Sequence, residues 1–481
     1  MIRMSHLDIP RFPRGFLLSE RPVEAPPTFV AGPILPNFYV HPWANVETAG
    51  DANLFVIVIG HAVPTRSEQV QQPAAHLLAS LRHGEGTFLA TLDDYGGRYA
   101  IIFGSAGNIR VVNDATGMRS VFYAAGGGVV ASHALLVEQA LGGPVVCGGL
   151  PFRYGYPGNL TPYARTKILT PNTYYWLTAN VVRRFWPIVE PAPRSVEDAA
   201  VELLEASTNA FRAMTEGRTV RLTLTAGLDS RTILAIALHS GVPFETYTYG
   251  NQYASKVDRL LAADLADEFG FEHTVLSNKA VDPVVTERLI ESHYSLHHSS
   301  WVASLQEYFS RRDDAAVLGN ALEIGRSNYT PQRRNGAAAP AAAETMAALH
   351  HMKLGKEIHQ QIDEYGHDQF WDESVCAFQS YIHDTGFDVV AGMLDPFDQF
   401  YWEHRMPTWQ GIAMGERDFY GEPFIPYNSR RVFNAMLGAP FDSRRNDEAV
   451  LRMIEMVDPR LLKLPINPKT WSKKRKLQLS L

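Results

Sequence analysis

The sequence predicts a mixed α/β and α+β protein in which a compact sheet domain precedes a parallel sheet domain. Short apolar strands and glycine-rich turns crowd residues 54–131, which is typical of a compact sheet domain. Strand and helix patterns alternate over residues 196–275, which indicates a parallel sheet with crossover helices. Residues 186–193, rich in proline, separate the two patterns. We therefore expect one domain over residues 1–190 and a second over 191–481.

The expected elements follow in chain order. The first forty residues are rich in proline and lack periodicity, so they predict an irregular lead-in. Strands are expected at 54–60, 98–103, 109–112, 121–123, 129–131, 165–177 and 182–185, with a helix at 74–82. In the second half, helices at 196–216, 230–240 and 256–269 alternate with strands at 220–224, 244–249 and 273–275. Beyond residue 280 the pattern is mainly helical.

Composition excludes several classes of protein. The chain of 481 residues carries a formal net charge of -7, so it has no general basic field for nucleic acid. Its cysteines, Cys147 and Cys376, cannot form a disulfide framework or a multi-cysteine zinc site. Its longest aliphatic run, residues 54–59, is far shorter than the ~20 residues that span a bilayer. We expect a cytoplasmic protein without membrane or nucleic-acid partners, and a homodimer stays open.

The turn Thr225-Ala-Gly-Leu-Asp-Ser230 carries the strongest functional pattern, because an apolar strand enters it and a helix leaves it. Such a turn directs backbone N–H groups and a helix N-terminus toward one point, which is a geometry that binds phosphate. Ala226 and Gly227 are small enough for close approach of an anion, and Thr225 and Ser230 add hydroxyl donors. Asp229 alone would repel phosphate, so it predicts a ligand for Mg²⁺. The alternative is an ordinary strand–turn–helix with an acid near the helix N-terminus.

This turn resembles the Ser-Gly-Gly-x-Asp-Ser pyrophosphate loop of the N-type ATP pyrophosphatases. That group includes glutamine-hydrolysing asparagine synthetase, β-lactam synthetase, carbapenam synthetase and the lasso-peptide cyclases. The resemblance implies an adenine nucleotide alpha hydrolase-like domain with a parallel sheet. It also implies that ATP is bound by Leu222, Leu224, Thr225, Ala226, Gly227, Leu228, Asp229 and Ser230. Tyr249 and Gly250, at the end of the next strand, take the place of the family's adenine contacts.

Three later segments fall in the family's order. Residues 319–329 resemble Gly-Asp-Gly-x-Asp-Glu-x-x-Gly-Gly-Tyr, which implies that Gly319 and Asn320 bind the nucleotide and that Glu323 holds Mg²⁺ with Asp229. Glu416 and the segment Pro426-Tyr-Asn-Ser-Arg-Arg431 resemble Glu-x-Arg-x-Pro-Phe-x-Asp-x-Arg. Through this resemblance Glu416 would orient or deprotonate an amine. The chain's end resembles the family's closing lysine segment, with Lys469 as the catalytic lysine and Lys463 as its competitor.

Residues 92–136 resemble the glutaminase domain of the same family, which implies an N-terminal Ntn-hydrolase sandwich. That glutaminase uses an N-terminal cysteine whose thiolate attacks glutamine. Here the sequence starts Met1-Ile2-Arg3, and neither cysteine is near this start. We therefore expect a degenerate glutaminase-like domain that has lost glutamine hydrolysis and serves as a structural partner.

Together these patterns predict an ATP-dependent carbon–nitrogen ligase that forms AMP and pyrophosphate, with ATP and Mg²⁺ as its cofactors. It would adenylate the carboxylate of a small molecule or peptide and transfer the acyl group to an amine. The alternatives are an ammonia-dependent amidotransferase acting on a sugar uronic acid or small acid, and a catalytically inactive scaffold. The sequence identifies neither substrate, and cyclisation and intermolecular amidation both stay open.

Overall fold

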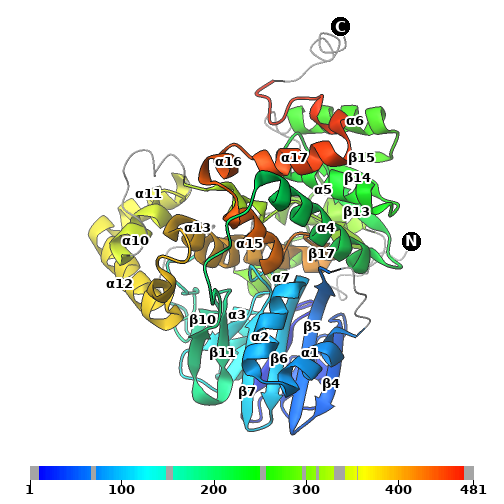
Figure 1. Ribbon diagram of the computed structural model, residues 1–481. Helices are drawn as coiled ribbons and strands as arrows, with labels where there is room; N and C mark the ends of the chain where they lie inside the picture. The colour runs from blue at the N-terminus through cyan, green and yellow to red at the C-terminus, as the bar shows by residue number, and fades with distance from the viewer. Residues whose placement is uncertain are drawn as a thin grey trace.

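The structure is a computed structural model that describes residues 10–66, 72–147, 155–249, 256–294, 299–309, 314–329, 342–354 and 356–470. Two antiparallel sheets form the N-terminal part, and a parallel sheet lies in the C-terminal part. In Figure 1 the antiparallel part lies below the parallel sheet, and α10, α11 and α12 lie to one side. The predicted mixed class of the fold is therefore confirmed.

The N-terminal part is a sandwich of two antiparallel sheets with helices on both outer faces. The first sheet has the order β10 (Thr166–Ile168), β8 (Phe122–Ala124), β9 (Val129–Ala131), β1 (Phe16–Ser19), β3 (Phe38–Val40) and β2 (Val30–Ala31). The second has the order β12 (Val181–Arg184), β11 (Thr173–Trp176), β7 (Asn108–Asn113), β6 (Tyr95–Ser105), β5 (Leu54–Pro64) and β4 (Val46–Asp51). Alternating apolar side chains such as Phe16, Ile57 and Ile102 fill the space between the sheets. Helices α1 (Pro73–Arg82) and α2 (Glu85–Thr91) cover the second sheet, and α3 (Ala134–Ala140) covers the first.

The expectation of an irregular lead-in over the first forty residues is wrong. Strand β1 lies inside the first sheet, where it pairs antiparallel with both β3 and β9. All of its residues are buried. A strand of four residues with partners this distant in sequence leaves no periodic signal, because its pairing is decided by tertiary contacts.

The parallel sheet has the order β15 (His273–Leu276), β14 (Glu245–Tyr249), β13 (Val220–Thr223), β16 (Ala315–Val317) and β17 (Glu422–Phe424). Every neighbouring pair is parallel. Helix α4 (Val196–Thr215) precedes the sheet, and α5 (Leu228–Ser240) and α6 (Lys256–Phe269) connect its first three strands. The chain builds outward from β13 on one side and continues from β16 on the other. This reversal makes the carboxyl ends of β13 and β16 the place where ligands bind in open α/β sheets.

The chain beyond residue 280 is mainly helical, as expected, apart from the short strands β16 and β17. Its helices are α7 (Pro283–His293), α8 (Ser299–Tyr308), α10 (Ala343–His351), α11 (Lys356–Tyr365), α12 (His367–Thr385), α13 (Pro396–Phe400), α14 (Ile412–Gly415), α15 (Arg430–Gly438), α16 (Phe441–Arg445) and α17 (Glu448–Val457). A π-helical segment, Tyr401–Gly411, joins α13 to α14. Across the described ranges, no helix is both long and apolar enough to cross a membrane.

Buried polar contacts join the sandwich to the parallel-sheet part. Arg98 donates to both carboxylate oxygens of Asp418 at 2.6 and 2.8 Å. Arg184 donates to both oxygens of Glu403 at 2.6 and 2.7 Å. These four side chains are buried, so each charge depends on a partner from the other part of the molecule.

Candidate functional site

The predicted strand–turn–helix is present at the carboxyl end of β13. Thr225 N–H donates to Ser230 Oγ at 3.1 Å, and Gly227 N–H donates to Thr225 Oγ1 at 3.1 Å. The two hydroxyls therefore fix the shape of the turn. Neither Ala226 nor Gly227 has a positive φ, so alanine fits this backbone without strain. Leu222 and Leu224 are buried before the turn, and Leu228 is buried within it.

Gly319 brings the second predicted segment against this turn. A Cβ atom added to Gly319 would lie 2.7 Å from the backbone oxygen of Asp229, so a larger residue would force the two backbones apart. The approach follows from the sheet, in which Leu222 of β13 is paired with Val317 of β16. Asn320 continues from Gly319 into the 3₁₀ turn Leu322–Arg326, which carries Glu323.

Asp229 and Glu323 form an acidic pair at this position. Burial and the charge of Asp229 raise the pKa of Glu323 to about 7. Burial also raises the pKa of Asp229, and Arg326 opposes this rise. Glu323 Oε2 is shielded from solvent and has no hydrogen-bond partner among the described residues. The buried hydroxyl of Tyr427 likewise has none, and the charges of Asp229 and Glu323 raise its pKa further beyond the effect of burial. This arrangement favours a bound cation.

Arg326 and Asp447 belong to the site although no sequence pattern predicts them. Arg326 Nη1 donates to Asp229 Oδ1 at 2.5 Å. Its Nε and Nη2 donate to Asp447 Oδ1 and Oδ2 at 2.6 and 3.2 Å. Arg326 stands at a variable position of the segment that the sequence analysis compared, and Asp447 belongs to none of the compared segments. Only the tertiary structure brings them to Asp229.

Asp258 is a further site residue that no sequence pattern predicts. It lies in the first turn of α6, and its Oδ1 accepts a hydrogen bond of 3.0 Å from Ala226 N–H. An acid at the start of a helix is common, because it complements the helix dipole. The sequence therefore offered no specific signal for this contact with the turn.

Tyr249 ends β14 at the same edge of the sheet, whereas Gly250 lies outside the described residues. The ring of Tyr249 packs 5.3 Å from that of Trp301, and Arg417 Nη2 donates to its hydroxyl at 3.4 Å. Glu416 directly precedes Arg417 in a 3₁₀ turn, Glu416–Phe419, and is fully buried. Glu416 is thus the sequence neighbour of Arg417, which contacts Tyr249, and not of Arg326, which contacts Asp229.

Glu422 also matches the spacing of the motif used to select Glu416, because it stands four residues before Pro426. It begins β17, is buried, and forms an ion pair with Arg14 of the sandwich. The turn follows the carboxyl end of β13, whereas Glu422 lies at the amino end of the parallel strand β17. Glu422 therefore lies on the other side of the sheet from the turn, at the interface with the sandwich.

The C-terminal segment runs beside the turn. Asn467 N–H donates to the carbonyl oxygen of Ala226 at 3.0 Å. Arg231 of α5 donates to the carbonyl groups of Leu461, Leu464 and Pro465. Lys469 follows two residues after Asn467 and is exposed, as is Lys463. Along the chain, Lys469 is therefore nearer than Lys463 to the residue that contacts the turn.

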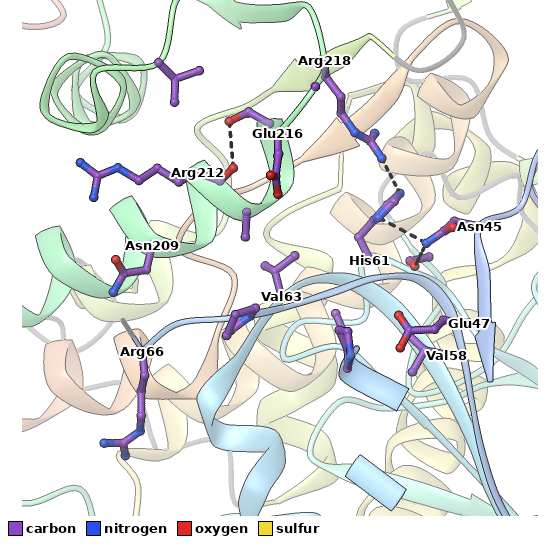
Figure 2. Close-up of a pocket in the computed structure, with 18 of the residues that line it drawn as sticks. Asn45, Glu47, Val58, His61, Val63, Arg66, Asn209, Arg212, Glu216 and Arg218 are labelled. Carbon is purple, nitrogen blue, oxygen red and sulfur yellow. Dashed lines mark hydrogen bonds between the residues drawn. The ribbon is translucent and has the colours of Figure 1, made fainter. Parts of the chain in front are cut away.

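A large cavity lies away from this site, beside the amino ends of β13 and β14. Figure 2 shows residues that line it. Its volume is about 1070 Å³, and it lies between β5 and the segment that joins α4 to β13. His61 lies at its wall, where Arg218 Nη2 is 3.1 Å from Nε2 and Asn45 Nδ2 is 3.4 Å from Nδ1. Burial lowers the pKa of His61 to about 4, against the attraction of Glu422.

Comparison with known proteins gives weak similarities only. No family model and no curated protein matches the sequence. Glutamine phosphoribosylpyrophosphate amidotransferase from B. subtilis, complexed with ADP and GMP, is 12% identical, with a TM-score of 0.21 over 61% of this chain and 60% of that chain. Glutamine-dependent NAD⁺ synthetase from Acinetobacter baumannii, in complex with ADP, is 14% identical, with a TM-score of 0.19 over 37% of this chain and 33% of that chain.

NMN synthetase from Francisella tularensis is 12% identical, with a TM-score of 0.20 over 58% of this chain and 100% of that chain. The chain thus spans less than two thirds of the amidotransferase and of the NAD⁺ synthetase. Similarities at these TM-scores carry no argument about function, so the proposals below depend on the site itself.

Proposed function

We propose that this protein is an ATP-dependent amide-bond-forming ligase that activates a carboxylate as its acyl-adenylate and transfers the acyl group to an amine. The proposed fold assignment is a degenerate Ntn-type sandwich joined to an ATP pyrophosphatase domain. The observation that carries the proposal is the meeting of Asp229 and Glu323 beside the turn Thr225–Ser230. Asp229 lies in the first turn of α5 after β13, and Glu323 lies in the 3₁₀ turn after β16. Both acids thus follow the carboxyl ends of adjacent parallel strands, which is where open α/β sheets bind nucleotides.

The donor set fits Mg²⁺. Magnesium is usually held by one or two carboxylates together with phosphate oxygens and water. Asp229 and Glu323 supply two carboxylates, and the shielded Oε2 of Glu323 lacks any other partner among the described residues. No cluster of three or more His, Cys, Asp or Glu side chains suited to a metal occurs in the described part of the chain. When bound, Mg²⁺ would supply neutralisation of phosphate charge.

The proposed reaction has two steps. An oxygen of the substrate carboxylate attacks the α-phosphorus of ATP, and the bond to pyrophosphate breaks. The amine nitrogen then attacks the acyl carbon, loses a proton, and AMP leaves with the former carboxylate oxygen. The turn amides and the start of α5 would hold the phosphates. Glu416 would orient or deprotonate the amine, and Lys469 would stabilise the tetrahedral oxyanion.

Exchange of labelled pyrophosphate into ATP tests the first step. A panel of carboxylates should contain one that supports exchange, and Asp229→Asn should reduce its rate at least ~100-fold because electrostatic stabilisation of the phosphates is lost. Asp442→Asn is the matched control, since Asp442 lies on α16 with an exposed side chain. Unchanged exchange in Asp229→Asn would contradict the role of Asp229, and a protein that fails to bind ATP in calorimetry would favour the inactive scaffold.

A further inference from the structure

Resting on the function proposed above, we infer that the site carries its own counter-ions: Arg326 occupies the position of the divalent cation, and Asp258 occupies the position of a phosphate oxygen. Binding of a metal–nucleotide complex then requires both side chains to leave the turn. The chain thereby couples entry of the cation to entry of the anion.

The cation half of this arrangement centres on Asp229. The Nη1 group of Arg326 donates to Asp229 Oδ1 at 2.5 Å, so a guanidinium contacts the carboxylate proposed to hold the metal. A guanidinium and a divalent cation at one carboxylate repel each other and compete for its oxygen lone pairs. Glu323 lies within electrostatic reach of both Asp229 and Arg326. Arg326 therefore neutralises the acidic pair that the metal would otherwise neutralise.

Asp447 provides the alternative partner that makes an exchange feasible. It accepts two hydrogen bonds from Arg326, at 2.6 and 3.2 Å, through a different part of the guanidinium from the one that contacts Asp229. Loss of the contact with Asp229 thus leaves Arg326 with a charged partner at the start of α17. A planar guanidinium with several donors suits such a shared position, whereas a lysine would supply one compact charge.

The anion half centres on Ala226. Of the amides in the turn, those of Thr225 and Gly227 donate to hydroxyls of the turn itself. The amide of Ala226 instead donates to Asp258 Oδ1 at 3.0 Å. Asp258 is thus a carboxylate oxygen bound where a phosphate oxygen would be bound, and it also repels an approaching phosphate.

Binding of Mn²⁺ alone, followed by electron paramagnetic resonance, tests the cation half. Arg326→Met should bind Mn²⁺ on the order of tenfold more tightly than the unchanged protein, because the competing cation is gone. Asp447→Asn should bind Mn²⁺ more weakly, because Arg326 then depends on Asp229. Arg452→Met, which removes an exposed arginine from its partners Glu197 and Glu455, is the control and should change nothing. Shifts in the same direction for Arg326→Met and Asp447→Asn, or none, would overturn the inference.

Binding of inorganic pyrophosphate without metal tests the anion half. Asp258→Asn should bind pyrophosphate on the order of tenfold more tightly, because a repelling charge is removed from the turn. Asp267→Asn, on the same helix α6, should leave binding unchanged. Weaker or unchanged binding by Asp258→Asn would overturn this half.

The two proposals fail in different ways. If the unchanged protein exchanges pyrophosphate into ATP but none of the expected shifts occurs, only the counter-ion inference is overturned. If the shifts occur without any exchange, the ligase proposal fails and the counter-ion arrangement stands.

Discussion

Burial determines the charge state of individual side chains in this molecule. Glu323 follows the carboxyl end of β16, and His61 of β5 lies beside Arg218 and Glu422, near the amino ends of β13 and β17. Burial suppresses the charged form of each. Glu323 shares its surroundings with Asp229, so a cation can restore its charge. His61 faces Arg218 and Glu422, and the hydrogen bond from Arg218 requires an unprotonated Nε2.

His61 makes stability depend on pH. Its pKa is about 4 in the folded protein against an ordinary value of 6.5, so between these values the unfolded chain binds a proton that the folded chain does not. The free energy of unfolding therefore rises as the pH increases from about 4 to 6.5. The stabilisation that neutral His61 allows is lost as the pH falls through the same range. Within this window, His61 changes the free energy of unfolding by up to about 1.4 kcal/mol per pH unit.

His61→Gln removes this contribution while keeping a hydrogen-bonding side chain at the cavity wall. We expect urea denaturation at pH 5 and pH 7 to show a smaller difference for His61→Gln than for the unchanged protein, by roughly 2 kcal/mol. Buried His350 and His404 titrate alike in both proteins and cancel from the comparison. Equal pH dependence in the two proteins would show that His61 does not carry this linkage.

At the scale of elements, the sequence predicts what is long and regular. Helix α6 begins and ends where its pattern indicates, because it has a continuous local signal. Strand β9 is only three residues long, and the glycine-rich turn 126–128 before it indicates its position. Strands β16 and β17 were missed, since three residues carry no detectable period. Their place in the sheet depends on contacts between distant segments.

The candidate site likewise contains residues that the sequence predicts and residues that only the folded chain brings together. Asp229 and Glu323 could be selected because each stands in a segment whose order and spacing resemble a known pattern. Arg326, Asp447 and Asp258 could not, since each contacts the site across a turn or helix end that only the folded chain brings near. Charged residues of this kind are common on helix ends, so their sequence positions alone do not distinguish them.

Helix α5 also holds the C-terminal segment against the turn, through the contacts of the buried Arg231 with backbone carbonyls of Leu461, Leu464 and Pro465. Arg231→Met should release this segment, so trypsin should cleave at Lys463 about tenfold faster, since cleavage of a locally opened chain follows its opening free energy. Acyl transfer should also slow if Lys469 acts from this segment.

Arg212→Met is the control, because Arg212 donates to carbonyls at the end of α5 instead. Unchanged cleavage would show that other contacts hold the segment.

At the scale of the whole molecule, the sandwich and the parallel sheet share a buried ionic cluster. Asp418 contacts Arg98 and Arg119 of the sandwich, and all three side chains are buried. Burial alone would raise the pKa of Asp418, but these two arginines hold it at about 2. The N-terminal part is therefore coupled to the rest of the fold through charges that neither part can bury alone.

Asp418→Asn should lower the free energy of unfolding by about 3–5 kcal/mol, because it leaves buried guanidinium groups without a counter-charge. Urea denaturation measures this loss. Asp94→Asn is the control, since the pair of Asp94 with Arg66 is exposed and its removal should cost at most about 1 kcal/mol. Equal losses for the two variants would contradict the importance of the buried cluster.

At the scale of the whole molecule, the proposed function also predicts which nitrogen source is usable. The glutaminase domain that the N-terminal part resembles uses an N-terminal cysteine, whereas Arg14 and Gly15 precede β1 here. Cys147 and Cys376 are both exposed, in a loop and on α12. We expect an amine or ammonia, but not glutamine, to give product from the activated carboxylate. The double variant Cys147→Ser, Cys376→Ser should keep full activity, because neither thiol takes part. Glutamine-dependent product formation that disappears in this double variant would show instead that one of the two cysteines attacks glutamine.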